Sequence, residues 1–357
     1  MEISETIPVV TGGKSVTSRA LVRRALHGLP VPRLAVGPLA VHYCAKLAGV
    51  SLRDYTLRSD VLADSIIKYH ERFQPDAVWL SADTWVNAQA MGASVAFPDE
   101  NQPLGGTGEP LIQTAADIDR IPPPDPTSQG RWPLMLAALR HVRAALGPEV
   151  FVVGCFDQYP FSLACALMGI ERIMLAVTDD LPMVKALMER CTEYTVAYAS
   201  ALAAEGADML SGGASPAALL GPKRYREIAL PFEQKAIARI KAATGLPVSL
   251  HICGNATPIL ADLTQSGADV LELDHRTNLR EACRLVPRHV AIWGNLDPVS
   301  VLAQGSPPDV RQVAQEFIHT MTAAGHQRFV LSSGCTLAVE TPAENLQALM
   351  DVARNQP

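Results

Sequence analysis

Residues 247–274 read PVSLHICGNATPILADLTQSGADVLELD. An apolar run at 247–252 is followed by a stretch with helical spacing at 256–266 and by a second apolar run at 269–273. Short buried runs separated by an amphipathic helix are typical of a βαβ unit in a parallel sheet. The stretch therefore predicts a strand, a crossover helix and a second, parallel strand.

The same rhythm extends outward from this unit along the chain. Helical stretches alternate with eight apolar runs, at 33–37, 77–82, 150–155, 208–212, 247–252, 269–273, 290–294 and 329–333. Eight parallel strands are the number that closes a barrel. A doubly wound open sheet is the competing architecture, but no G-x-G-x-x-G follows the first strand. The sequence therefore predicts an α/β fold of the (β/α)8, or TIM-barrel, type.

Two segments interrupt the rhythm. Residues 97–130 are rich in Pro, Gly and Asp, so we expect them to form a long excursion from the barrel. Residues 1–30 precede the first strand, and we expect an N-terminal extension whose helix covers the bottom of the barrel. Residues 31–357 would then form a single catalytic barrel domain.

Composition narrows the class of protein. The chain has 357 residues, of which 48% are hydrophobic, enough for a large core. A net charge of -6 offers no basic face for nucleic acid. No apolar run approaches the roughly 20 residues of a membrane span, and the N-terminus lacks the order of a signal peptide. We therefore expect a cytoplasmic enzyme without a nucleic-acid or membrane partner.

Three residues at predicted strand ends have the side chains of a metal site. His251 and Cys253 are two apart in a strand, so both point to one face, and Cys335 follows the eighth strand. One imidazole and two thiols suit zinc, and three protein ligands leave a fourth position open for substrate. The bland alternative is a packed histidine beside a buried cysteine, because spacing alone does not join Cys335 to the pair.

A family resemblance spans nearly the whole chain. The matching segments are RALHG (24–28), FQPDAVWLSAD (73–83), YPFSLACALMG (159–169), LLGPKRYREIALPFEQKAI (219–237), LHICGNATPIL (250–260), WGNLDP (293–298) and SSGCTLAVETPAENLQAL (332–349). Together they resemble the uroporphyrinogen decarboxylase superfamily. The H-x-C-G-N run with a distant G-C pair resembles its branch of zinc-dependent corrinoid methyltransferases, of the methylcobalamin:coenzyme M type.

The resemblance implies a function in one-carbon metabolism. That branch moves a methyl group from a methylated corrinoid to a thiol such as coenzyme M or to tetrahydrofolate. His251, Cys253 and Cys335 are similar to its Zn²⁺ ligands. The chain has no D-x-H-x-x-G element of corrinoid-binding modules, so methylcobalamin is expected on a partner corrinoid protein. The acceptor would be a small molecule, and a homodimer is an open alternative because superfamily members are often dimers.

Two other functions stay open. The decarboxylases hold a catalytic aspartate where this chain has Asp83, so a decarboxylase that uses Asp83 without a metal is one alternative. Their arginine-rich R-Q-A-G-R loop is missing here, and Asp83 lacks basic neighbours in the sequence. A corrinoid-binding component without catalytic activity is the other alternative.

Glu272 and Asp274 lie at the end of the strand that follows the His251 strand. Either could be a fourth zinc ligand or a partner that orients His251. The resemblance adds that the superfamily usually keeps an acid at Asp274, which makes it a catalytic candidate together with Asp83. The alternative for both is a helix cap or a solvated carboxylate at the rim.

Other residues at strand ends are candidates for substrate binding: Asp157, Tyr159, Gly212, Asn295 and Asp297. The polar side chains could bond to a cofactor edge, and Gly212 would let a flat ligand approach the backbone. Each could equally be part of ordinary loop architecture.

Overall fold

The computed structural model describes residues 16–106 and 108–356. Seven parallel strands form one curved sheet, and neighbours in the sheet follow chain order. The strands are β1 (Ala77–Leu80), β4 (Phe151–Gln158), β5 (Met209–Gly213), β6 (Val248–Ile252), β7 (Val270–Leu273), β8 (Ala291–Leu296) and β9 (Phe329–Ser333). They match seven of the eight predicted runs.

Residues 35–37 occupy the eighth position of the ring. Val36 makes a parallel bridge to Leu331 in β9, and its carbonyl accepts a hydrogen bond of 2.8 Å from the backbone N–H of Asp76, next to β1. The strand predicted at 33–37 is therefore shortened to one bridged residue, since Pro38 has no N–H with which to continue the ladder. The ring is closed nonetheless, and the (β/α)8 fold is confirmed.

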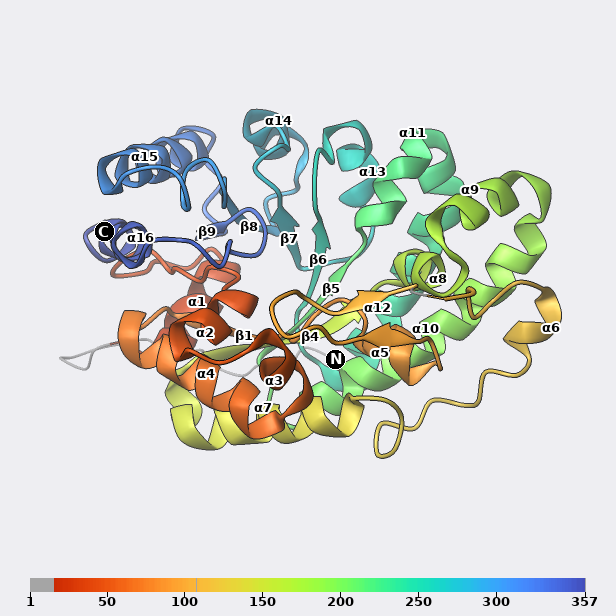
Figure 1. The fold of residues 1–357 in the computed structure, drawn as a ribbon. Helices are drawn as coiled ribbons and strands as arrows, with labels where there is room; N and C mark the ends of the chain where they lie inside the picture. The colour runs from red at the N-terminus through yellow and green to blue at the C-terminus, as the bar shows by residue number, and fades with distance from the viewer. Residues whose placement is uncertain (1–15, 107, 357) are drawn as a thin grey trace.

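Helices surround the strands and alternate with them along the chain (Figure 1). The α-helices are α1 (Ser18–Leu26), α2 (Val41–Ala48), α3 (Leu52–Leu57), α4 (Ser59–Phe73), α5 (Val86–Ala90), α6 (Ala115–Ile118), α7 (Trp132–Leu146), α8 (Pro160–Met168), α9 (Ile170–Asp179), α10 (Leu181–Ala204), α11 (Gly221–Arg224), α12 (Leu230–Thr244), α13 (Leu260–Leu263), α14 (Leu279–Leu285), α15 (Pro307–Ala323) and α16 (Ala343–Arg354). Shorter turns are η1 (Gly147–Glu149), η2 (Ser215–Leu220), the π-helical η3 (Tyr225–Ala229) and η4 (Thr257–Ile259).

The interior of the barrel is a separate apolar core. Trp79, Phe151 and Trp293 are buried there with aliphatic side chains of the other strands. Apolar residues of α1, among them Leu21 and Val22, pack on the same cluster and close its lower end. The predicted helix over the barrel bottom is therefore present, whereas residues 1–15 of the predicted extension lie outside the described residues.

The predicted excursion at 97–130 is also present, coloured orange to yellow in Figure 1. It includes β3 (Leu104–Gly105), which pairs antiparallel with β2 (Val95–Ala96), and the short helix α6. Gly105 lies so close to the ring of Trp85 that a Cβ there would be 2.0 Å from it. A glycine at this position therefore lets the excursion pack directly on the residue that precedes α5.

No single helix among residues 16–106 and 108–356 is long and apolar enough to cross a membrane. The pair α8 and α9 would meet the requirement only together, and the two helices are bent by 111° relative to each other.

Candidate metal centre

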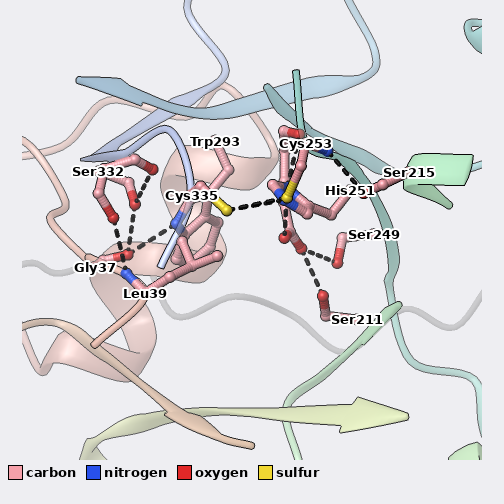
Figure 2. A network of polar contacts seen from close by, with 12 residues as sticks. Gly37, Leu39, Ser211, Ser215, Ser249, His251, Cys253, Trp293, Ser332 and Cys335 are labelled. Carbon is pink, nitrogen blue, oxygen red and sulfur yellow. Dashed lines mark hydrogen bonds and ion pairs between the residues drawn. The ribbon is translucent and has the colours of Figure 1, made fainter. Parts of the chain in front are cut away.

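The side chains of His251, Cys253 and Cys335 meet at the carboxyl-terminal rim of the barrel. Nε2 of His251 lies 3.0 Å from Sγ of Cys253, which lies 3.0 Å from Sγ of Cys335. The third separation, from Cys335 Sγ to His251 Nε2, is 3.7 Å. Figure 2 shows the two sulfur atoms facing each other beside the imidazole. The fold thus brings together residues that the sequence separates by more than 80 positions.

Local structure explains this convergence. His251 lies in β6, and Cys253 follows the strand on the same face; its backbone N–H donates to Ser215 Oγ over 2.9 Å. Gly254 then adopts φ +90°, which turns the chain away from the rim. Before Cys335, Gly334 packs so tightly that a Cβ would lie 2.5 Å from the backbone nitrogen of His275. Any side chain at Gly334 would push the Cys335 loop away from the other two ligands.

Glu272 fixes the orientation of the imidazole. Nδ1 of His251 donates to the backbone carbonyl of Glu272 over 3.2 Å, and its carboxylate Oε2 lies 3.8 Å from the same nitrogen. In the neutral imidazole with its proton on Nδ1, Nε2 has its lone pair free toward the two sulfurs. Ser211 Oγ, at 2.8 Å, and Ser249 Oγ both donate to Oε1 of Glu272 (Figure 2). This chain of contacts fixes His251 with Nε2 toward the two sulfurs.

The three groups also affect one another's protonation. The Cys335 thiol donates to Cys253, which lowers the pKa of Cys253 and raises the pKa of Cys335, with burial acting against ionisation of both. Burial by itself would lower the pKa of His251, but Cys335 and Glu272 raise it to about 9. Cys253 therefore loses its proton more easily than Cys335, and a cation that binds would displace the protons of Cys335 and His251.

The donor set fits zinc. A tetrahedral zinc ion with bonds of about 2.0 Å to nitrogen and 2.3 Å to sulfur separates its ligand atoms by roughly 3.5–3.8 Å. The separation of 3.7 Å lies in this range, and the two of 3.0 Å are shorter, so the ligand atoms would move apart by about half an ångström or more around an ion. Among the described residues, the ligand atoms of these three side chains lie within 4.8 Å of one another, close enough to hold one metal ion. Three ligands leave a tetrahedral ion one position for another molecule.

A cavity of about 350 Å³ adjoins the metal-binding residues. His251, Cys253 and Cys335 are part of its wall, and so are Glu272 and Gly212. Asp83 and Asp157 line the same cavity. Seven of the candidates from the sequence therefore lie around one hollow, which is the geometry of a small-molecule site.

The sequence suggested that Asp83 lacks basic neighbours, but the structure places Arg131 beside it. Both carboxylate oxygens accept from Arg131, which joins through Nη2 to Oδ1 over 3.0 Å and through Nη1 to Oδ2. Oδ1 also accepts from the backbone N–H of Trp85 over 2.7 Å. The expectation of an isolated Asp83 was wrong because Arg131 follows the long excursion and returns to the rim only through the fold.

Asp157 and Tyr159 are two positions apart in the sequence, but only Asp157 lines the cavity. Asp157 lines the cavity, and its Oδ2 accepts from the backbone N–H of Asn87 over 3.0 Å. Burial raises the pKa of the Asp157 carboxyl well above its usual range. Tyr159 is fully buried, and its hydroxyl donates to the carbonyl of Ser249 over 2.8 Å. Tyr159 therefore joins β4 to β6 rather than the cavity.

Gly212 lies in the cavity wall, but the reason for a glycine here is the neighbouring ring of Phe156. A Cβ at this position would be 2.1 Å from the ring of Phe156. The glycine therefore allows β4 and β5 to pack, whatever ligand approaches the opposite side.

The remaining candidates form a separate hydrogen-bonded rim outside the cavity lining. Asp274 Oδ1 accepts from the backbone N–H of Arg276 over 2.8 Å, and Asn295 Nδ2 donates to the Asp274 carbonyl over 3.3 Å. His275 lies between Asp274 and Asp297, with N···O distances of 3.1 and 3.3 Å. The structure therefore brings Glu272, but not Asp274, Asn295 or Asp297, to the metal-binding residues.

Sequence reasoning missed the serines that support the site. Ser211 and Ser249 pair in register across β5 and β6, and both are buried beside Glu272. A signal was present, because Ser211 is the polar residue of β5 and Ser249 lies two positions before His251 in β6. Such a residue inside a barrel needs a partner.

Comparisons with known proteins agree with this geometry. The family model described as uroporphyrinogen decarboxylase (URO-D) matches residues 17–356. The methylcobamide:CoM methyltransferase MtbA of Methanosarcina acetivorans is 28% identical over 283 residues, 78% of this chain and 80% of that protein. A uroporphyrinogen decarboxylase of Solibacter usitatus is also 28% identical, over 83% of this chain and 84% of that protein.

A solved structure has the same fold. It is described as a methyltransferase from Methanosarcina mazei, and it superposes with a TM-score of 0.85 over 95% of this chain and 98% of that chain. The two sequences are 24% identical, so this likeness concerns the fold alone. With the family match over residues 17–356, the conclusion is that the chain belongs to the uroporphyrinogen decarboxylase family.

Proposed function

We propose that the protein is a zinc-dependent methyltransferase that moves a methyl group from a methylated corrinoid to a small thiol. The observation that carries this proposal is the convergence of His251, Cys253 and Cys335 at a cavity of about 350 Å³. Relatives named as methylcobamide:CoM methyltransferases support the donor and the class of acceptor. Tetrahydrofolate is the other acceptor that fits the reaction class.

The residues of the chain have distinct roles in this proposal. Zinc held by the three side chains would supply a Lewis acid that lowers the pKa of an acceptor thiol, and the thiolate is the nucleophilic form. Glu272 keeps His251 in the tautomer that offers Nε2. Ser211 and Ser249 hold Glu272 in place. The site is therefore positioned before any substrate arrives, which is the main source of rate in a displacement.

The cavity supports division of labour between acceptor and donor. A volume of about 350 Å³ is at the lower end of small-molecule pockets and suits a small thiol, whereas a corrin macrocycle is much larger. The methylated corrinoid would therefore approach the open mouth on a separate corrinoid protein. The acceptor thiolate would form a sulfur–carbon bond to its methyl group from the cavity side. The cobalt–carbon bond would break with its electron pair left on cobalt, and the proton of the thiol would go to solvent.

Metal analysis together with turnover tests the proposal. Purified protein is expected to contain about one zinc per chain and to demethylate methylcobalamin when a thiol is added, followed by the cobalt spectrum. Removal of the metal should abolish demethylation, and added Zn²⁺ should restore it. Full activity in protein freed of metal would overturn the proposal, and intact zinc binding without turnover would favour a non-catalytic corrinoid-binding component.

A decarboxylase is the second candidate, favoured by the place of Asp83 in the cavity wall and by the decarboxylase relatives. Against it, Asp83 is already paired with Arg131, whose guanidinium would have to exchange partners. Decarboxylation of a porphyrinogen by metal-free protein, lost in Asp83→Asn, would support this candidate. The homodimer stays a prediction, which a mass measurement in solution would check.

A further inference from the structure

The cavity next to the metal-binding residues has an unusual charge. No lysine or arginine is part of its wall among residues 16–106 and 108–356. Arg131 lies behind Asp83 and uses its guanidinium on Asp83 and on Gln89 Oε1. His42 lines the cavity, but burial lowers its pKa, and its Nε2 lies 2.7 Å from the Ala82 carbonyl. An anionic ligand would therefore find no cation outside the metal-binding residues.

One part of the wall has hydrogen-bonding atoms without partners. Asp157 Oδ1, Gln158 Oε1 and Ser162 Oγ have none, and all three residues line the cavity. The other oxygen of Asp157, Oδ2, accepts a hydrogen bond from the backbone N–H of Asn87. Gln158 donates through Nε2 to the Thr84 carbonyl over 2.6 Å. The unused atoms are thus a carboxyl oxygen, an amide oxygen and a hydroxyl, all three buried. The amide oxygen can only accept, and so can the carboxyl oxygen when Asp157 is ionised.

We infer that the methyl acceptor has a head group that donates hydrogen bonds and carries no negative charge, and that Asp157 selects it. This inference rests on the proposed methyl transfer. An ammonium group of an aminothiol and the N–H edge of a reduced pterin both have this chemistry. A sulfonate, as in coenzyme M, would be placed beside Asp157 and Glu272 without a counter-charge, which is unfavourable for a desolvated anion.

One feature acts in the opposite direction. The N-terminus of α8, which begins at Pro160, would by itself attract an anion, and Ser162 in its first turn lines the cavity. The carboxyl group of Asp157 precedes this terminus by three residues, and in its ionised form it places negative charge there. The two effects make opposite predictions for the acceptor, so a pair of matched thiols can separate them.

The test compares thiols that differ only in the head group. Cysteamine (2-aminoethanethiol) and coenzyme M (2-mercaptoethanesulfonate) have the same two-carbon link, and their three-carbon homologues remove any effect of reach. Binding to the zinc-loaded protein is measured by calorimetry, and kcat/KM is measured with methylcobalamin. The ammonium thiols are expected to bind more tightly than the sulfonates by about 10- to 100-fold, the range of one charge-assisted hydrogen bond.

Asp157→Asn supplies the decisive variant. Asparagine can keep the bond to Asn87 and tolerates the φ of +75° at this position, while its NH2 group replaces the free acceptor by a donor. The ammonium-to-sulfonate ratio should fall by about 10-fold or more. Since each ratio is compared between wild type and variant, intrinsic differences in thiol reactivity cancel. Asp60→Asn, at an exposed side chain far along the chain, is the matched control and should leave the ratio unchanged.

The outcomes separate this inference from the proposed function. Tighter binding of the sulfonates, or an unchanged ratio in Asp157→Asn, would overturn the inference while leaving methyl transfer intact. Absence of demethylation with every thiol, including 2-mercaptoethanol, would instead contradict thiol methylation, and calorimetry would still rank the head groups. Tetrahydrofolate serves as a further probe, because formation of its N-methyl product would identify the pterin rather than an aminothiol as the acceptor.

Discussion

At the amino-terminal end of the strands, Asp76 and Asp208 are surrounded by cations and backbone donors. Asp76 accepts from Arg33 through two bonds of 2.6 and 2.7 Å and from the backbone N–H of Val36. Asp208 pairs with Arg143 over 2.6 Å and also accepts from Arg19. Both carboxylates are buried and fully engaged, and they tie the first segments of the chain to β1 and β5.

At the opposite end, Asp157 and Glu272 are as deeply buried but form no ion pair with a lysine or arginine of residues 16–106 and 108–356. Each keeps one oxygen without a hydrogen-bond partner, and both line the cavity. Burial raises the pKa of both carboxyl groups. Carboxylates at the bottom, whose oxygens all have hydrogen-bond partners, stabilise the barrel. Those at the mouth keep an oxygen without a partner and are therefore candidates for ligand binding.

Loss of a metal ligand should give the largest effect at the mouth. Cys335→Ala is expected to weaken zinc binding by more than about 100-fold, since even partners behind the ligands contribute up to that much. Demethylation should fall in parallel. Competition with a zinc chelator measures the affinity, and Cys283→Ala, a buried cysteine beside Met321, is the control that should keep its zinc. Retained affinity in Cys335→Ala would remove this residue from the site.

Glu233 is a buried carboxylate that does not line the cavity and keeps one oxygen without a hydrogen-bond partner. It therefore shows how such a carboxylate affects the free energy of unfolding when no ligand is involved. Burial raises its pKa to about 7, although Tyr225 donates to it over 2.5 Å. An acid whose pKa is raised on folding adds stability below its ordinary value of 4.5 and loses it as the pH rises through 7.

The free energy of unfolding should therefore contain a term that falls by on the order of 3 kcal/mol between about pH 4.5 and 7. Glu233→Gln should lack this fall. Denaturant unfolding of wild type and variant at several pH values measures the difference, and parallel curves would contradict the prediction.

Loss of a fully hydrogen-bonded carboxylate at the bottom should lower the stability of the protein without changing its catalytic activity. Asp208→Asn leaves Arg19 and Arg143 without their shared counter-charge, and both arginines are partly exposed. We expect a loss of about 2–3 kcal/mol in the free energy of unfolding. Zinc content and kcat/KM should be unchanged at a temperature where the variant is folded. A change in kcat/KM would break the distinction between the two ends.

Glu272→Gln should produce the smallest of these effects, and at the mouth. The amide preserves the shape and can still accept from Ser211 and Ser249, but it removes the charge beside His251. Zinc affinity should decrease by about 10- to 100-fold, with little change in the melting temperature. Unchanged zinc affinity together with lower stability would place Glu272 with the structural carboxylates of the bottom.

Much of the fold could be predicted because its signals are local. The alternation of apolar runs and helical stretches predicted all seven strands and the helix over the barrel bottom. The eighth strand was predicted at full length but is one bridged residue. The backbone N–H of Val36 donates to the side chain of Asp76, and Pro38 has no N–H to continue the ladder. Periodicity gives the number of strands, and hydrogen-bonding groups at each position decide how far a strand extends.

The sequence by itself determined the barrel and the chemical types at its rim, including one imidazole and two thiols at strand ends. Only the tertiary structure decided which acids serve them: Glu272 faces His251, while Asp274, two residues later, is engaged by the loop of His275 and Arg276. It also joined Arg131 to Asp83 across the excursion. The physical reason is that residue type and period are properties of neighbours in the chain, whereas partners around a closed ring depend on register and on the path of each loop.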